Sequence, residues 1–318
     1  MPTAIIVATE TGGPTGQVAL WVVAASVLAA TALAAAACRR MRGTTLIGPI
    51  VWTVIACWGV AGAEFYLAFA GGRQEASSIA ASLRYASALL VFCPPLAAMG
   101  AKRPQHHPWQ FVVLSLWGVL SLPAWEVLLI RPHQALDVEG LRAWFLPALI
   151  LLGLANQLGT RFWPSALLAV SAQFAILTPY FPLLRYDVGV WGSATALLLV
   201  DLAVLLVLLG VPRRRVDPKP LDRVWLDFRD AFGAVWALRL AERFNAASRC
   251  FEWNVNLEWD GFTIPGGGSP DEQLPAEVET VLRQNLKNLL RRFVSNEWIQ
   301  RRWEIPPPST GGVQRDCD

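Results

Sequence analysis

The chain has 318 residues, of which 54% are hydrophobic and only 16% charged, and its net charge is +3. A soluble domain carries roughly a quarter charged residues, so this composition excludes a chain that is soluble throughout. The small net charge gives no support for a nucleic-acid partner. The five cysteines are scattered without C-x-x-C spacing, so we expect no disulfide framework, metal site or cofactor.

Seven apolar runs have about the length that crosses a bilayer, roughly 17–25 residues. No Lys or Arg precedes the first run, which is typical of a retained anchor rather than a cleaved signal peptide. The fifth and sixth runs are the shortest and contain prolines, so they could instead form a kinked or re-entrant pair. The runs span residues 17–38, 46–70, 79–100, 109–130, 141–158, 163–180 and 190–211.

The loops between these runs alternate in positive charge. Lys and Arg are retained on the cytoplasmic side of a membrane, and here they gather after the first, third, fifth and seventh runs. We therefore expect a short external N-terminal segment, 1–16, and a cytoplasmic C-terminus. A membrane of the bacterial cytoplasmic type is the expected location.

The composition changes after a proline-rich connector at 212–220. Apolar residues at helical spacing predict an amphipathic helix over 221–248 and a second from 275 to about 303. Between them, alternation over 253–259 predicts a strand, and Asp260-Gly261 predicts a two-residue hairpin turn.

The predicted fold class is therefore mainly α, with a polytopic seven-helix transmembrane bundle at 17–211. A small α+β domain with helix–hairpin–helix order follows at 221–304, on the cytoplasmic side. The residues from 305 to 318 are rich in Pro, Ser and Gly and are expected to be disordered.

Four ionisable residues lie inside the apolar runs, namely Glu64, Arg84, Glu126 and Asp201. Such groups cost about 2.5–3.5 kcal/mol at the membrane centre on insertion scales, so each is a candidate for function. The topology places Glu64, Arg84 and Glu126 at similar depth in the outer part of the bilayer, where one arginine could pair with two carboxylates. A structural ion pair or snorkelling to the headgroups is the alternative interpretation. Asp201 lies too deep to snorkel, and it could face Gln173 or Thr195.

The Cys93-Pro94-Pro95 sequence predicts a kink in the third helix, because proline frees backbone carbonyls. The kink could serve only the shape of the helix, or it could open a cavity. No G-x-x-x-x-G-K-[ST] loop and no H-E-x-x-H motif is present, and no lysine or histidine lies in the membrane runs to hold retinal or haem.

Three classes of function remain. The first is a membrane scaffold, sensor or complex subunit that acts through its cytoplasmic domain on a protein partner. The second is a small-solute transporter with three-one-three helix repeats, and the third is a membrane-embedded enzyme with an outward-facing Glu/Arg/Glu site. The lipid bilayer is a partner in all three, and anionic headgroups are expected near the basic residues Arg213, Arg214, Arg215, Arg291 and Arg292.

Overall fold

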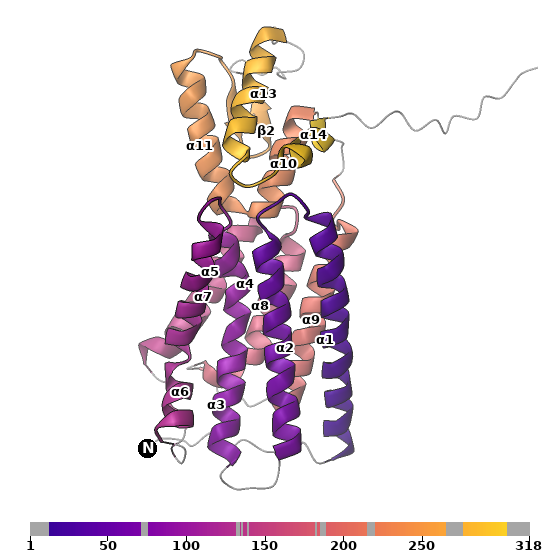
Figure 1. The fold of residues 1–318 in the computed structure, drawn as a ribbon, viewed down its shortest axis with the longest axis vertical. Coiled ribbons are helices and arrows are strands. Elements are labelled where there is room, and N and C mark those ends of the chain that lie inside the picture. The colour runs from indigo at the N-terminus through magenta and orange to yellow at the C-terminus, as the bar shows by residue number, and fades with distance from the viewer. Residues whose placement is uncertain are drawn as a thin grey trace, which may run out of the picture.

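The computed structural model is mainly helical, with one two-stranded sheet. Figure 1 shows a long bundle of helices and, beyond one end of it, a compact unit built from the C-terminal part of the chain. The N-terminal segment up to residue 12, the glycine-rich loop at 266–270 and the tail at 305–318 lie outside the described residues. The structure describes residues 13–70, 76–131, 134, 136–138, 140–181, 183–184, 189–214, 220–264 and 276–303.

The bundle is a set of helices in which α9 lies between α1 and α8, and α2 lies against α1, α3 and α4. Helix α6 packs on α3, and α7 packs on α8. The helices are α1 (Pro14–Arg40), α2 (Ile47–Ala70), α3 (Ala76–Ala88), α4 (Cys93–Met99), α5 (His106–Leu120), α6 (Leu122–Leu129), α7 (Leu141–Leu158), α8 (Trp163–Leu177) and α9 (Gly189–Leu209), with 3₁₀ turns η2 (Leu89–Phe92) and η3 (Thr178–Tyr180).

Among the described residues, five helices are long and apolar enough to cross a membrane, or six if the bent pair α5 and α6 is counted as one span. Helix α8 has only 15 residues and is followed by the 3₁₀ turn η3. The sequence predicted that the fifth and sixth runs were the ones that could be kinked or re-entrant. Helix α7, which covers the fifth run, is nevertheless a continuous helix of 18 residues with Pro147 inside it, long and apolar enough to cross a membrane. The sharp bend lies in the fourth run instead, where α5 and α6 meet at 60°.

The bend between α5 and α6 comes from Ser121-Leu122-Pro123. Pro123 at the start of α6 has no N–H to continue the helical ladder of α5. Polar side chains add hydrogen bonds to the carbonyls of the last turn of α5, because the Ser121 hydroxyl donates to the carbonyls of Trp117 (2.7 Å) and Gly118 (3.1 Å). The Tyr85 hydroxyl donates to the Leu120 carbonyl at 3.2 Å. A broken helix at membrane depth is tolerated where such partners exist.

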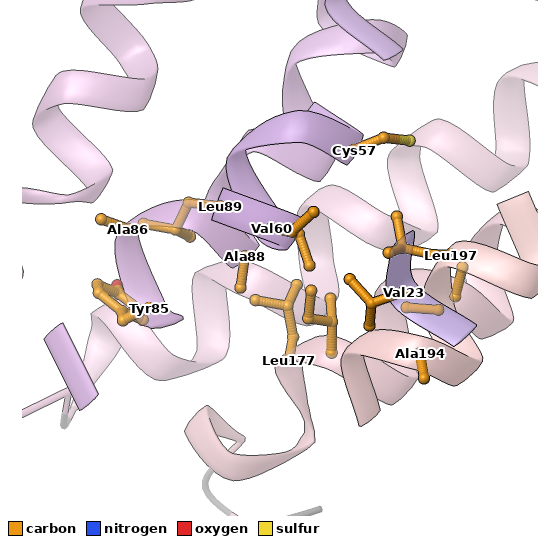
Figure 2. Packing of buried hydrophobic residues seen from close by; sticks show 14 of the residues in the cluster. Val23, Cys57, Val60, Tyr85, Ala86, Ala88, Leu89, Leu177, Ala194 and Leu197 are labelled. Carbon is orange, nitrogen blue, oxygen red and sulfur yellow. The ribbon is translucent and has the colours of Figure 1, made fainter. Parts of the chain in front are cut away.

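The bundle core mixes small and large side chains. Figure 2 shows Ala86, Ala88 and Ala194 among larger residues such as Tyr85, Leu89 and Leu177. Small residues let helix backbones approach closely, which is how helices associate in lipid. Many other large apolar side chains of the bundle are exposed, as the 88% exposure of Phe69 and the 89% exposure of Leu141 illustrate.

The C-terminal unit has large aromatic side chains in its core and few large apolar side chains exposed. Trp225, Phe228 and Phe244 are each fully buried, and Phe228 stacks on Phe232 with ring centroids 4.7 Å apart. The unit consists of α10 (Pro220–Phe232), α11 (Ala234–Cys250), β1 (Asn256–Glu258), β2 (Gly261–Thr263), α13 (Ala276–Leu290) and α14 (Asn296–Trp303).

Two helices predicted as continuous are each divided in two. Gly233, with φ +78°, separates α10 from α11, and the segment 291–295 separates α13 from α14. The hairpin is also shorter than predicted, because Glu252 and Asn254 have left-handed backbone conformations, so the first strand begins only at Asn256. Glu258 pairs with Gly261, so the two turn residues are 259 and 260, one position before the predicted pair.

Candidate functional site

Two of the four intramembrane candidates form a buried ion pair. The Arg84 guanidinium on α3 donates to both carboxylate oxygens of Glu64 on α2, with its Nη2 at 2.9 Å from Oε2 and its Nε at 3.1 Å from Oε1. Ser193 on α9 donates a further hydrogen bond to Glu64 Oε1 at 2.8 Å. Glu64 is only 1% exposed, so the carboxylate is fully enclosed and joins three helices.

Glu126, the third candidate of the predicted outer cluster, lies elsewhere. Its carboxylate is 3.6 Å from the guanidinium of Arg131, and the two side chains are 52% and 55% exposed. Salt bridges this exposed contribute little to stability. The structure therefore joins one carboxylate, not two, to Arg84 by an ion pair among the described residues.

Asp201 lies on α9, eight residues before its last residue, Leu209, and thus about 12 Å along the helix from that end. Both carboxylate oxygens are buried, and Ser26 of α1 is the hydroxyl that lies next to them. Gln173, a predicted partner, instead donates to the carbonyl of Val91 at 3.1 Å. A functional role for Asp201 stays a prediction.

A cavity of about 160 Å³ lies between α2, η2, α4, α8 and α9. Pro94 and Pro95 line one wall, so the proline pair of the third run does border a cavity. The wall is apolar except for a few groups such as Thr53, Cys57 and Gln173. An apolar cavity of about 150 Å³ stays dry and accepts a benzene-sized ligand, so this one fits a short hydrocarbon segment.

The C-terminal unit contacts four loops at the same end of the bundle. The segment 292–295 pairs with two of them through backbone hydrogen bonds, from Thr45 N–H to the Phe293 carbonyl (2.9 Å) and from Arg103 N–H to the Arg292 carbonyl (2.8 Å). The Trp259 indole donates to the Gly159 carbonyl at 3.0 Å, in the loop between α7 and α8. Arg214, after α9, provides the fourth contact.

Helix α11 is capped by a side chain of the bundle. Gly233 is its N-cap residue and offers no side chain, so the N–H of Val235 donates to Oδ1 of Asn156 on α7 at 2.9 Å. A Cβ at Gly233 would lie 2.5 Å from Nδ2 of Asn156, which explains why glycine stands here. The side-chain amide of Asn156 thus accepts the hydrogen bond that the Ser or Asp side chain of an N-cap residue usually accepts from the first turn of its own helix.

Asp230 is the centre of a charged network between the unit and the bundle. Its side chain is 1% exposed and has three arginines around it. Arg229 Nη2 lies 2.9 Å from Oδ1, and Arg214 Nη2 lies 2.9 Å from Oδ2. Arg161 adds a backbone hydrogen bond at 3.2 Å and a contact of 3.6 Å from its Nε. Burial is the main cause that lowers the pKa of Arg161, and repulsion from Arg214 is the second.

The network continues outward through Asp227. This carboxylate pairs with Arg214 at 3.0 Å and with Arg302 of α14 at 2.7 Å. Arg302 also stacks on Trp298, with its Cζ 3.7 Å from the ring centroid. The chain from Arg161 to Arg302 therefore ties α7–α8, α9, α10 and α14 together.

Protein-family models, curated proteins and solved structures contain no match to this chain.

The geometry of these sites favours structure over catalysis. Within the described ranges, no group of three or more His, Cys, Asp or Glu side chains is placed to hold a metal. Glu64 accepts hydrogen bonds from Arg84 and Ser193, so it is held as a bonded carboxylate rather than as an available base. The pair contributes a fixed link between helices.

Sequence reasoning missed Ser193, Asn156 and Asp230. Ser193 and Asn156 bond to residues 129 and 79 positions away, and Asp230 joins its neighbour Arg229 to Arg214 and to Arg161, which is 69 positions away; no local pattern reveals these contacts. One signal was present, since Gly233 inside an amphipathic pattern is unfavourable unless a turn or a close contact needs it.

Proposed function

We propose that this protein is a seven-pass membrane scaffold, or a subunit of a membrane complex, whose cytoplasmic C-terminal unit is a fixed platform for a protein partner. The observation that carries the proposal is the docking of the unit on four bundle loops by backbone hydrogen bonds and the Asp230 network. A unit held at four points cannot swing freely, so any surface that it presents keeps one orientation to the membrane.

The position of those loops supports a count of seven passes. Two passes separate each of the four docked loops from the next, and one pass, α1, precedes the first. Seven passes place all four loops at one end, with α5–α6 as a bent pass and α8 with η3 as a short one. Arginines in these loops favour the cytoplasm for this end.

Cysteine labelling tests this topology. In a chain without its five native cysteines, Arg42→Cys and Gln105→Cys report one end of the bundle, and Arg131→Cys and Leu184→Cys report the other. All four positions are exposed. We expect a membrane-impermeant maleimide added to intact cells to label only the second pair. Labelling of one member of each pair would contradict the seven passes.

The partner surface is tested separately. Three large apolar side chains of the unit are exposed, namely Leu238 (59%), Phe251 (64%) and Val281 (46%). A photo-crosslinking residue at each position is expected to form one discrete adduct in native membranes, lost when a neighbouring exposed residue is changed to Asp. The same residue at exposed Leu184 is the matched control. Absence of any discrete adduct at all three positions would contradict a platform.

A small-solute transporter is the second candidate, and the cavity between α2, α4, α8 and α9 favours it. Asp201, whose carboxylate is buried, lies on the helix that forms one wall. Uptake into proteoliposomes that depends on Asp201, and is lost in Asp201→Asn, would support transport.

A further inference from the structure

A basic cluster lies where the C-terminal unit meets the loop between α4 and α5. Lys102 comes from that loop, Arg239 and Arg243 from consecutive turns of α11, and Arg292 from the segment after α13. The backbone hydrogen bond from Arg103 N–H to the Arg292 carbonyl, at 2.8 Å, holds two of these segments together. The cluster is thus a product of docking, because its residues come from three separate parts of the chain.

Trp236 lies among these cations. Lys102 Nζ is 5.8 Å and Arg239 Cζ is 5.4 Å from the centroid of its ring, distances at which a cation is attracted to the aromatic face. Phe293 packs against the same indole at 5.0 Å and fixes its position. The indole N–H is buried and has no acceptor among the described residues.

Among the described residues, these four cations have no salt-bridge partner, whereas several other arginines do. No carboxylate in the described part of the chain forms a salt bridge with any of them, whereas Arg161, Arg214, Arg229 and Arg302 all share Asp227 or Asp230. Burial lowers the pKa of Lys102, and repulsion from Arg243, Arg292 and Arg239 lowers it further. The fold therefore brings like charges together at a cost, which a bound anion would offset.

We propose that Lys102, Arg239, Arg243 and Arg292 bind a phosphate group at the membrane surface. Guanidinium groups bind phosphate through paired N–H donors, and a lysine adds a mobile point charge. Lys102 stands three residues after the end of α4 at Met99, within the depth of the headgroups, so an anionic phospholipid is the nearest source of phosphate. The site rests on the proposed insertion of the bundle and adds a lipid ligand to the platform.

Purified full-length protein in neutral detergent provides the test. Two probes are titrated at constant ionic strength, namely phosphatidylglycerol doped into the micelles, with phosphatidylcholine as its reference, and soluble pyrophosphate. The variant is the double substitution Arg239→Gln/Arg243→Gln, at two exposed positions. The matched control is Arg249→Gln/Arg301→Gln, which removes the same charge from exposed positions outside the cluster.

We expect the variant to lose affinity for phosphatidylglycerol by about tenfold or more, because it removes two guanidinium groups that would form charge-assisted hydrogen bonds with the phosphate. Loss confined to pyrophosphate would support the phosphate site but assign it a soluble ligand. Equal losses in variant and control, or no saturable binding of either probe, would overturn the proposal. None of these outcomes depends on a protein partner. The proposal that the unit is a platform for a partner is tested separately, by the photo-crosslinking experiment.

Discussion

The bundle and the C-terminal unit differ in how many of their large apolar side chains are exposed. The bundle buries both small residues such as Ala19 and large ones such as Tyr85 and Leu146, and it leaves many other large apolar side chains exposed, whereas the unit encloses nearly all of its own, including Trp225 and Phe228. All but three of the exposed large apolar side chains among the described residues lie before residue 212. The difference reflects the two solvents, because burying an apolar side chain is favourable when it leaves water but gives no hydrophobic gain when it leaves lipid.

The two regions also bury charge differently. In the bundle, one carboxylate meets one arginine and a hydroxyl, and charge is balanced within the site. At the junction, buried Asp230 contacts three arginines. The excess positive charge is partly neutralised by Asp227, which pairs with Arg214, and by exposed Asp260, which pairs with Arg229. The Glu64–Arg84 pair links neighbouring helices of the bundle. The Asp230 carboxylate instead links the C-terminal unit to loops of the bundle that are distant from it in the sequence.

Replacing the shared carboxylate is expected to have the largest effect. Asp230→Ala leaves three arginines facing one another in a largely buried site, and we expect a loss of about 3–5 kcal/mol in the free energy of unfolding. Thermal unfolding in detergent measures it. Asp260→Ala is the matched control, because Asp260 pairs with the same Arg229 but is 95% exposed, so little change is expected. Equal effects would contradict a central role for Asp230.

Breaking the Glu64–Arg84 pair of the bundle is expected to have the next largest effect. Glu64→Ala leaves the Arg84 guanidinium buried without a carboxylate partner, and we expect a loss of about 3 kcal/mol in the free energy of unfolding. Glu126→Ala provides the comparison, since it removes the same side chain from a pair that is about half exposed. We expect its unfolding temperature to match that of the unchanged protein. A similar fall in both variants would mean that burial of the pair is not what stabilises it.

A smaller effect is expected at the helix cap. Asn156→Ala removes the acceptor for Val235 N–H and should cost about 1–2 kcal/mol, the range of a lost N-cap. Hydrogen exchange in the first turn of α11 should rise with it. Asn156→Asp keeps the oxygen and adds a charge that suits a helix N-terminus, so it should retain most of the protection. Unchanged exchange in Asn156→Ala would show that the bundle does not cap α11.

The smallest effect has the opposite sign. Lys102→Gln removes a cation that is repelled by three arginines, so we expect the unfolding temperature of ligand-free protein to rise slightly. The pKa of Lys102 is lower in the folded state, so the unfolded chain binds more protons and the unchanged protein gains stability as pH rises towards 10.5. The gap between the two proteins should therefore narrow between pH 8 and pH 10. A gap that widens would contradict repulsion at Lys102.

The sequence predicts those features that depend on local composition. Apolar runs and loop arginines mark the bundle, and helical spacing after residue 220 marks the amphipathic helices. The pairing of Glu64 with Arg84 could be predicted because few residues separate their two helices, which places both side chains at similar depth. What escaped prediction depends on contacts across the chain. The breaks at Gly233 and at 291–295 exist because Asn156 and the loop at 43–45 meet the backbone there.

The docking of the C-terminal unit is the central claim, and one cross-link tests it most directly. Thr44 and Val294 form an isolated antiparallel bridge, and facing residues in such a bridge lie about 4.5–5.5 Å apart, within reach of a disulfide. In a cysteine-free chain, purified Thr44→Cys/Val294→Cys protein should cross-link nearly completely under mild oxidation, and each single variant should not. Absence of that disulfide would show that the unit does not dock on the bundle.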